Sequence, residues 1–149
     1  MPPMLPSARV LAGATLSGSK SGRTKCNVMQ GLKFISKILL GILFILAGLN
    51  HFLNPDVYLS IMPPYLPSPL FLVYLSGAFE ILFGTLVLFP KWTKFAAWGI
   101  IFVLVAIFPA NLHMALNAED FSFIPSILLW LRLPFQAVLI AWAYWHTQK

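Results

Sequence analysis

Apolar residues run in four long stretches along the chain, and short polar or proline-rich segments separate them. The stretches cover residues 32–52, 69–89, 95–116 and 126–145. Each has about 20 residues, which is enough for a helix to cross a ~30 Å hydrocarbon layer at ~1.5 Å per residue. Helices joined by short connections pack as antiparallel neighbours. The pattern therefore predicts an all-α, integral membrane four-helix bundle with up-down-up-down topology.

The composition and the placement of charge support this interpretation. Hydrophobic residues make up 59% of the 149 residues and charged residues only 9%, whereas a soluble domain carries about 25% charge. The formal net charge of +6 does not indicate nucleic-acid binding, because five of the ten basic residues lie just before or at the start of the first apolar stretch, namely Lys20, Arg23, Lys25, Lys33 and Lys37. With Lys91 and Lys94 in the second loop, they place both termini in the cytoplasm, or on the equivalent side of an organelle membrane.

Residues 1–30 differ from the membrane domain that we expect over residues 31–149. They are rich in Ser, Gly, Thr and Pro and carry four basic residues and no acid, which predicts a disordered tail. Three interpretations stay open: an organelle transit peptide, a cytosolic tail, or a start-site artefact with translation beginning at Met29. We expect a multi-pass protein of the bacterial inner membrane, or of an organelle membrane if residues 1–30 are a transit peptide.

Glu80 lies at the centre of the second apolar stretch. An ionised acid at the bilayer centre costs about 2.5–3.5 kcal/mol on insertion scales, so such a residue usually turns toward a partner inside a bundle. Ser76, Gly77 and Gly84 lie three or four residues away and share the face of Glu80. The two glycines leave the backbone bare, so we expect another helix to approach closely at this face.

The other three stretches also carry polar residues near this depth. His51 ends the first stretch, and Arg132 and Gln136 lie four residues apart in the fourth. Counted at ~1.5 Å per residue from the outer ends, Glu80 is about 16 Å deep, Gln136 about 15 Å and Arg132 about 9 Å. We therefore expect an intramembrane polar cluster in the outer half of the bundle, made of His51, Glu80, Asn111, Arg132 and Gln136.

Partners within this cluster are not determined by the sequence. Glu80 and Arg132 are candidates for an ion pair, but Arg132 can instead extend to the membrane interface. Glu80 would then need another partner, either His51 or a second chain. Each residue also has a purely structural interpretation, such as Asn111 linking two helices by hydrogen bonds.

Five motifs in order carry a resemblance to a known family. They are Gly48-Leu-Asn-His51-Phe52, Ile61-Met-Pro-Pro-Tyr-Leu-Pro67, Ser76-Gly77 with Glu80, Phe108-Pro-Ala-Asn-Leu-His-Met114 and Leu131-Arg-Leu-Pro-Phe-Gln136. Over about residues 32–145 the chain is similar to the DoxX family of small four-helix membrane proteins. The resemblance implies an integral membrane protein. Some members or relatives are associated with quinone-linked or thiol-stress redox systems, and others are described as assembly factors.

Two hypotheses for the function follow. In the first, the chain is a membrane subunit of a quinone- or thiol-linked redox system. The polar cluster then binds a quinone headgroup, Glu80 or His51 carries a proton, and a partner protein supplies the redox cofactor. In the alternative, the chain is a non-catalytic scaffold or assembly factor for other membrane proteins. Beyond the lipid bilayer, the expected partners are a redox protein or a second copy of the chain.

The sequence shows no self-contained catalytic site. It contains no nucleophile–base arrangement and no phosphate-binding loop. Its single cysteine, Cys26, cannot run an internal dithiol cycle, and no cysteine cluster is present for zinc or iron–sulfur ligation. We therefore assign no catalytic residue, no metal site and no intrinsic cofactor, and expect quinone as the one candidate ligand.

Overall fold

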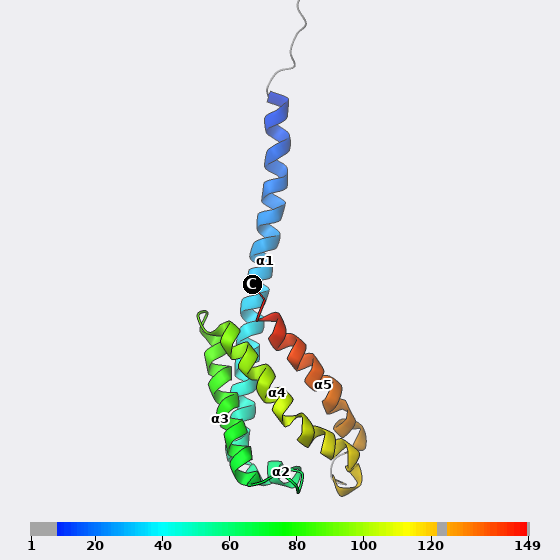
Figure 1. Ribbon diagram of the computed structural model, residues 1–149. Coiled ribbons are helices and arrows are strands. Elements are labelled where there is room, and N and C mark those ends of the chain that lie inside the picture. Colours follow the sequence, from blue (N-terminus) through cyan, green and yellow to red (C-terminus); the bar gives the residue numbers. More distant parts are fainter. Residues whose placement is uncertain (1–8, 122–124, 149) are drawn as a thin grey trace, which may run out of the picture. The chain divides into compact units, whose positions relative to one another are not determined.

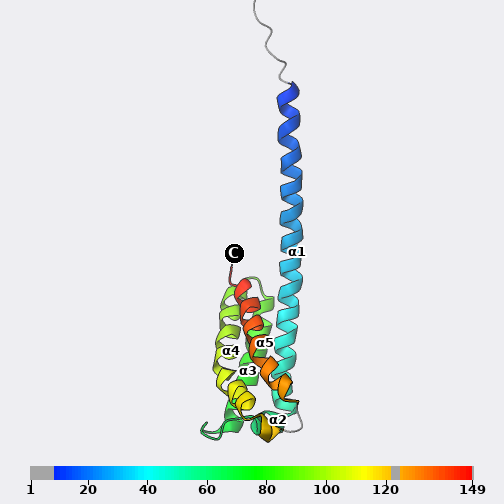
Figure 2. The same cartoon turned by 90° about the vertical axis from the view of Figure 1, so that its right-hand side faces the viewer.

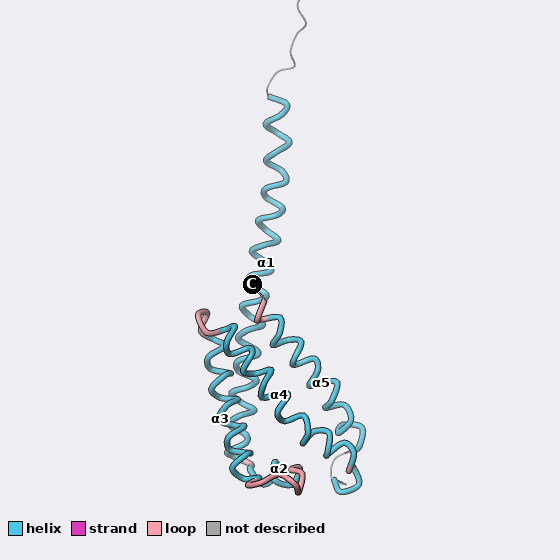
Figure 3. The backbone as a smooth tube through the Cα atoms, in the orientation of Figure 1, coloured by secondary structure: helices cyan, strands magenta, loops and turns pink. Residues whose placement is uncertain are grey.

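The computed structural model describes residues 9–121 and 125–148 (Figure 1). The elements, in order, are α1 (Arg9–Leu53), α2 (Pro55–Ser60), α3 (Pro69–Leu88), α4 (Thr93–Leu116), the 3-10 helix η1 (Ala118–Phe121) and α5 (Ser126–Trp145). Every regular element within these ranges is a helix, and short loops join them (Figure 3). The predicted all-α class is confirmed.

Helix α1 begins at Arg9, and the disorder expected over residues 1–30 stays a prediction. Ala, Leu, Lys and Arg in this segment are good helix formers. The chain divides into two compact units between Ser36 and Lys37, and α1 contributes to both. Residues 1–8 lie outside the described part, so the three interpretations of the N-terminal segment stay predictions.

Four of the described helical segments are long and apolar enough to cross a membrane. They are Asn27–Leu53, Pro69–Leu88, Thr93–Leu116 and Ser126–Trp145. Many large apolar side chains on them point outward, for example Phe102, which is 70% exposed, and Val138, which is 61% exposed. Such surfaces suit lipid as the surrounding solvent. These helices indicate a multi-pass membrane protein, while the side of the membrane on which the termini lie stays a prediction.

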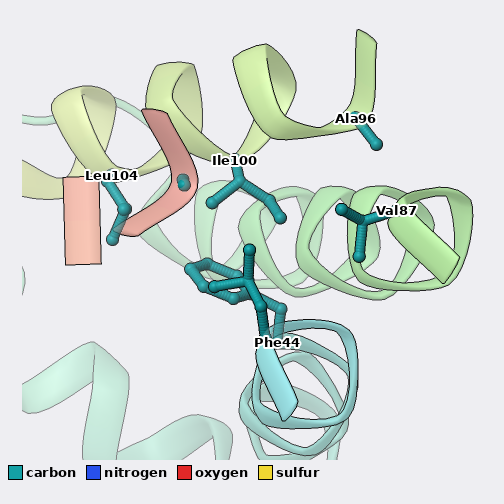
Figure 4. Packing of buried hydrophobic residues seen from close by; sticks show 7 residues of the cluster. Phe44, Val87, Ala96, Ile100 and Leu104 are labelled. Atoms are coloured by element: carbon teal, nitrogen blue, oxygen red, sulfur yellow. The ribbon is translucent and has the colours of Figure 1, made fainter. Parts of the chain in front are cut away.

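Within residues 37–149, the helices pack around one apolar core. In Figure 4, Phe44 of α1 points toward Ile100 of α4 and the neighbouring part of α3. The buried members of this cluster are Leu40, Phe44, Val87, Ala96, Ile100, Leu104 and Ala143. Helix α4 packs on both α3 and α5, so it lies between these two helices. The cluster holds the bundle together at the end where α3 turns into α4.

Helices α1 and α3 meet backbone to backbone at two glycine pairs. A Cβ atom added to Gly48 would lie 2.6 Å from the carbonyl oxygen of Gly77, and one on Gly77 would lie 2.9 Å from that of Gly48. Gly41 and Gly84 repeat the arrangement, at 2.8 and 2.9 Å. These distances are too short for any larger residue, so the contact requires glycine. The close approach predicted at Gly77 and Gly84 is confirmed.

The glycine contact gives a test of the packing. We expect Gly48→Ala and Gly77→Ala each to destabilise the bundle by about 1–3 kcal/mol, because the added methyl group must push two backbones apart. Gly31→Ala is the matched control, since nothing lies within 4 Å of a Cβ at that position. Alanine there should leave stability unchanged or raise it, because alanine favours the helix. Thermal unfolding in one detergent measures all three, and equal melting temperatures for the three variants would contradict the contact.

Candidate functional site

A cavity of about 360 Å³ lies within residues 37–149, between α3 and α4. The two helices are joined at the Pro90 turn and diverge toward the other end of the bundle, where α2 lies (Figures 1 and 2). Helix α2 and the segment that follows it contribute Tyr58, Ile61, Met62 and Leu66 to the lining. Most lining residues are apolar, and the polar ones are His51, Tyr58, Ser76, Asn111 and Arg132.

Three of the five predicted cluster residues therefore face one cavity, and the other two lie behind them. His51, Asn111 and Arg132 line it. Glu80 contacts His51, and Gln136 contacts Asn111.

His51 and Glu80 meet across the contact between α1 and α3. Nε2 of His51 lies 3.6 Å from Oε2 of Glu80, and both residues are buried. A Cβ atom on Gly77 would lie 2.7 Å from Cβ of His51. Glycine at position 77 therefore leaves the space that His51 needs to stand beside the acid.

The ring of His51 is also held from its other side by α2. Tyr58 stacks on it with ring centroids 3.7 Å apart. The hydroxyl oxygen of Tyr58 accepts a 2.8 Å hydrogen bond from Nδ2 of Asn50, whose Oδ1 accepts one of 2.7 Å from Nδ2 of Asn54. These contacts fasten α2 to the end of α1 and fix the orientation of His51.

Two buried polar atoms of the cavity lining have no hydrogen-bond partner in the described chain. They are Nδ1 of His51 and Oγ of Ser76. Buried polar atoms are nearly always paired in folded proteins, so each unpaired one calls for an explanation. Both belong to residues that line the same cavity, which suits a ligand that forms hydrogen bonds there.

Asn111 and Gln136 form a second polar link, between α4 and α5. Nδ2 of Asn111 donates a 3.0 Å hydrogen bond to Oε1 of Gln136. Nε2 of Gln136 donates to the carbonyl oxygen of Leu104. Pro109 lies inside α4, and its missing N–H leaves the carbonyl of Val105 without its usual helical donor, next to the Leu104 carbonyl that Gln136 contacts. Both ends of the Gln136 amide are therefore used within the protein, and this residue orients Asn111.

Arg132 does not pair with Glu80. Its guanidinium donates to Sδ of Met114 at 3.5 Å, and within the described ranges the titratable side chain beside Glu80 is that of His51. Of the candidate partners named from the sequence, His51 and not Arg132 lies beside Glu80. The reason is the packing order: α4 lies between α3 and α5, while the glycine contact brings α1 directly against Glu80.

Two polar lining residues, Tyr58 and Ser76, were not among the predicted site residues. Ser76 could have been found, because it lies one helical turn before Glu80 on the same face. Tyr58 carries no such signal, since its position depends on how the proline-rich segment after α1 folds back. Among the described residues, no group of three His, Cys, Asp or Glu side chains could hold a metal ion.

Comparison with known proteins identifies a family. The family described as a domain of unknown function (DUF8561) matches residues 40–147, which is well over half of the chain and contains every residue of the site. No curated protein matches, and neither does any solved structure. The DoxX family is not identified, so that resemblance stays a prediction.

The His51–Glu80 contact predicts energetic coupling between the two residues. In a double-mutant cycle of His51→Phe and Glu80→Gln, we expect a coupling energy of about 0.5–3 kcal/mol. Phenylalanine keeps the stack on Tyr58, so the cycle isolates the polar contact. The matched cycle of Glu80→Gln with Arg132→Leu should be additive within about 0.5 kcal/mol. Unfolding in detergent measures both cycles, and the opposite pattern would make Arg132 the partner of Glu80.

Proposed function

The chain belongs to the DUF8561 family, and we propose that it is a quinone-binding membrane subunit of a redox system. The observation that carries the proposal is the cavity between α3 and α4. Its volume of about 360 Å³ falls in the range of about 300–1,000 Å³ that is typical of small-molecule sites. An apolar lining with a few convergent polar groups is also typical of such sites.

The polar lining suits the headgroup of a quinone. A quinone ring carries two carbonyl oxygens, which accept hydrogen bonds but cannot donate them. The residues that line the cavity include Arg132, Ser76 and His51, whose guanidinium, hydroxyl and imidazole groups can act as donors. Asn111 provides an amide at the α4 wall, held in place by Gln136. The headgroup therefore binds at the α2 end of the cavity.

The His51–Glu80 pair supports a role in proton transfer. Reduction of a quinone to a quinol takes up two electrons and two protons. Because His51 lines the cavity and Glu80 lies 3.6 Å behind its ring, His51 can deliver one of these protons to a quinone oxygen and regain a proton through Glu80. The second proton reaches the other oxygen from water. In this proposal, a redox cofactor of a partner protein supplies the two electrons.

The resemblance to the DoxX family supports the same proposal, because some members or relatives are associated with quinone-linked or thiol-stress systems. We further propose that both termini lie in the cytoplasm, from the distribution of Lys and Arg. The corresponding membrane is the bacterial inner membrane, or an organelle membrane if residues 1–30 are a transit peptide.

A non-catalytic scaffold or assembly factor is the second candidate function. It is favoured by the Asn111–Gln136–Leu104 link, in which polar side chains join two helices by hydrogen bonds. The glycine pairs between α1 and α3 are likewise explained by helix packing alone, without a ligand. Under this alternative the cavity would hold ordinary lipid chains and show no preference for a quinone headgroup.

Equilibrium binding of a tritiated quinone to the protein in nanodiscs, with empty nanodiscs subtracted, tests the proposal. We expect the wild type to bind and Ser76→Ala and His51→Ala each to bind about threefold to tenfold more weakly, since a hydrogen bond contributes about 0.5–1.5 kcal/mol. His113→Ala and Ser60→Ala are matched controls, because neither residue lines the cavity. A wild type without quinone binding would favour the scaffold.

A further inference from the structure

The geometry points to a portal on the lipid-facing side of the cavity, between α3 and α4, through which the hydrophobic tail of a bound quinone extends into the bilayer. This inference rests on the proposed function and specifies its ligand as a long-tailed, membrane-soluble quinone. The portal is formed by Leu75 and Phe79 of α3 and by Phe102 and Ala106 of α4.

The lining residues of each helix divide into an inner and an outer set. Val73 of α3 and Val103 of α4 line the cavity and are almost fully buried, at 1% and 5% exposure. Phe79 and Phe102 also line it, yet they are 37% and 70% exposed. A side chain that both borders the cavity and reaches the surface stands at an opening. The opening therefore lies along the outer edges of α3 and α4.

The spacing of these residues supports a continuous edge. Leu75 and Phe79 lie four residues apart on α3, and Phe102 and Ala106 lie four apart on α4. Residues with this spacing are stacked on one face of a helix. Both pairs lie in the middle of segments that are long and apolar enough to span the membrane. The opening consequently faces hydrocarbon, and a ligand reaches it from the lipid phase.

The polarity of the two ends of the cavity orients the ligand. The four portal residues are all apolar, whereas His51, Tyr58, Asn111 and Arg132 gather toward the end covered by α2. A cavity of about 360 Å³ is at the low end of the range for drug-sized ligands, which is about 300–1,000 Å³. It accommodates a quinone ring but not a long tail as well. The ring therefore lies among the polar groups, and the tail leaves between Phe79 and Phe102.

Obstruction of the portal tests this arrangement. Ala106→Leu and Ala106→Trp place side chains of increasing size in the opening. The matched control is Val105→Trp, which adds a comparable bulk at the neighbouring position of α4, where the side chain is 56% exposed and does not line the cavity. Melting temperatures of the Ala106 and Val105 variants in the same detergent confirm that the bundle is intact. Binding is measured in nanodiscs with two tritiated probes, a decyl-substituted benzoquinone and the same ring without a tail.

We expect Ala106→Trp to weaken binding of the decyl quinone by about tenfold, which corresponds to about 1.4 kcal/mol, with a smaller loss for Ala106→Leu. Binding of the tail-free ring should stay unchanged in both, and Val105→Trp should match the wild type with both probes. Unchanged binding of the decyl quinone in Ala106→Trp would overturn the portal while leaving the quinone site in place. Equal losses for both probes would also overturn it, because the substitution would then fill the ring site. If the wild type binds neither probe, the proposed function itself fails.

Discussion

The backbone contact between α1 and α3 is the constraint on which the site depends. Two reciprocal glycine pairs, Gly41 with Gly84 and Gly48 with Gly77, bring the helices closer than any side chain would permit. In a membrane, where lipid is as apolar as the core, such close packing and interhelical hydrogen bonds replace the hydrophobic effect as the source of association. The consequence for function is local: His51 reaches the buried carboxylate of Glu80 only because residue 77 has no side chain.

The cavity forms because the helices are closely packed at one end of the bundle and further apart at the other. Near the Pro90 turn, the cluster around Phe44 and Ile100 fills the space between helices. At the α2 end, α3 and α4 diverge (Figure 1), and the space between them is only partly filled by Tyr58 and the segment that follows α2. The polar residues border this unfilled end. The helices thus pack closely at one end and diverge at the other. As a result, the cavity lies next to the His51–Glu80 pair in the centre of the bundle.

The sequence was sufficient to predict the helices and much of the site, but not the pairing of its residues. Apolar runs of spanning length predict the membrane helices, and comparable depth brought together His51, Asn111 and Arg132, which do line one cavity. Depth does not reveal which helices are neighbours. Depth alone therefore makes Arg132 a candidate partner of Glu80, although α4 lies between α3 and α5, the helices that carry them. Tyr58 could not be predicted as a site residue, because its position depends on how the segment between α1 and α3 folds back. The hydrophobic periodicity of the sequence does not predict that fold-back.

Photolabelling tests the central claim most directly, namely that the cavity between α3 and α4 is a quinone site. A quinone with a photoreactive group on its ring would be irradiated with the wild-type protein in nanodiscs and the labelled residues identified by mass spectrometry. The account predicts label on cavity residues such as Ser76, Val103 and Asn111, and loss of that label when excess unmodified quinone is added. Label spread over outward-facing residues such as Phe71 and Val138, with no effect of competitor, would contradict it.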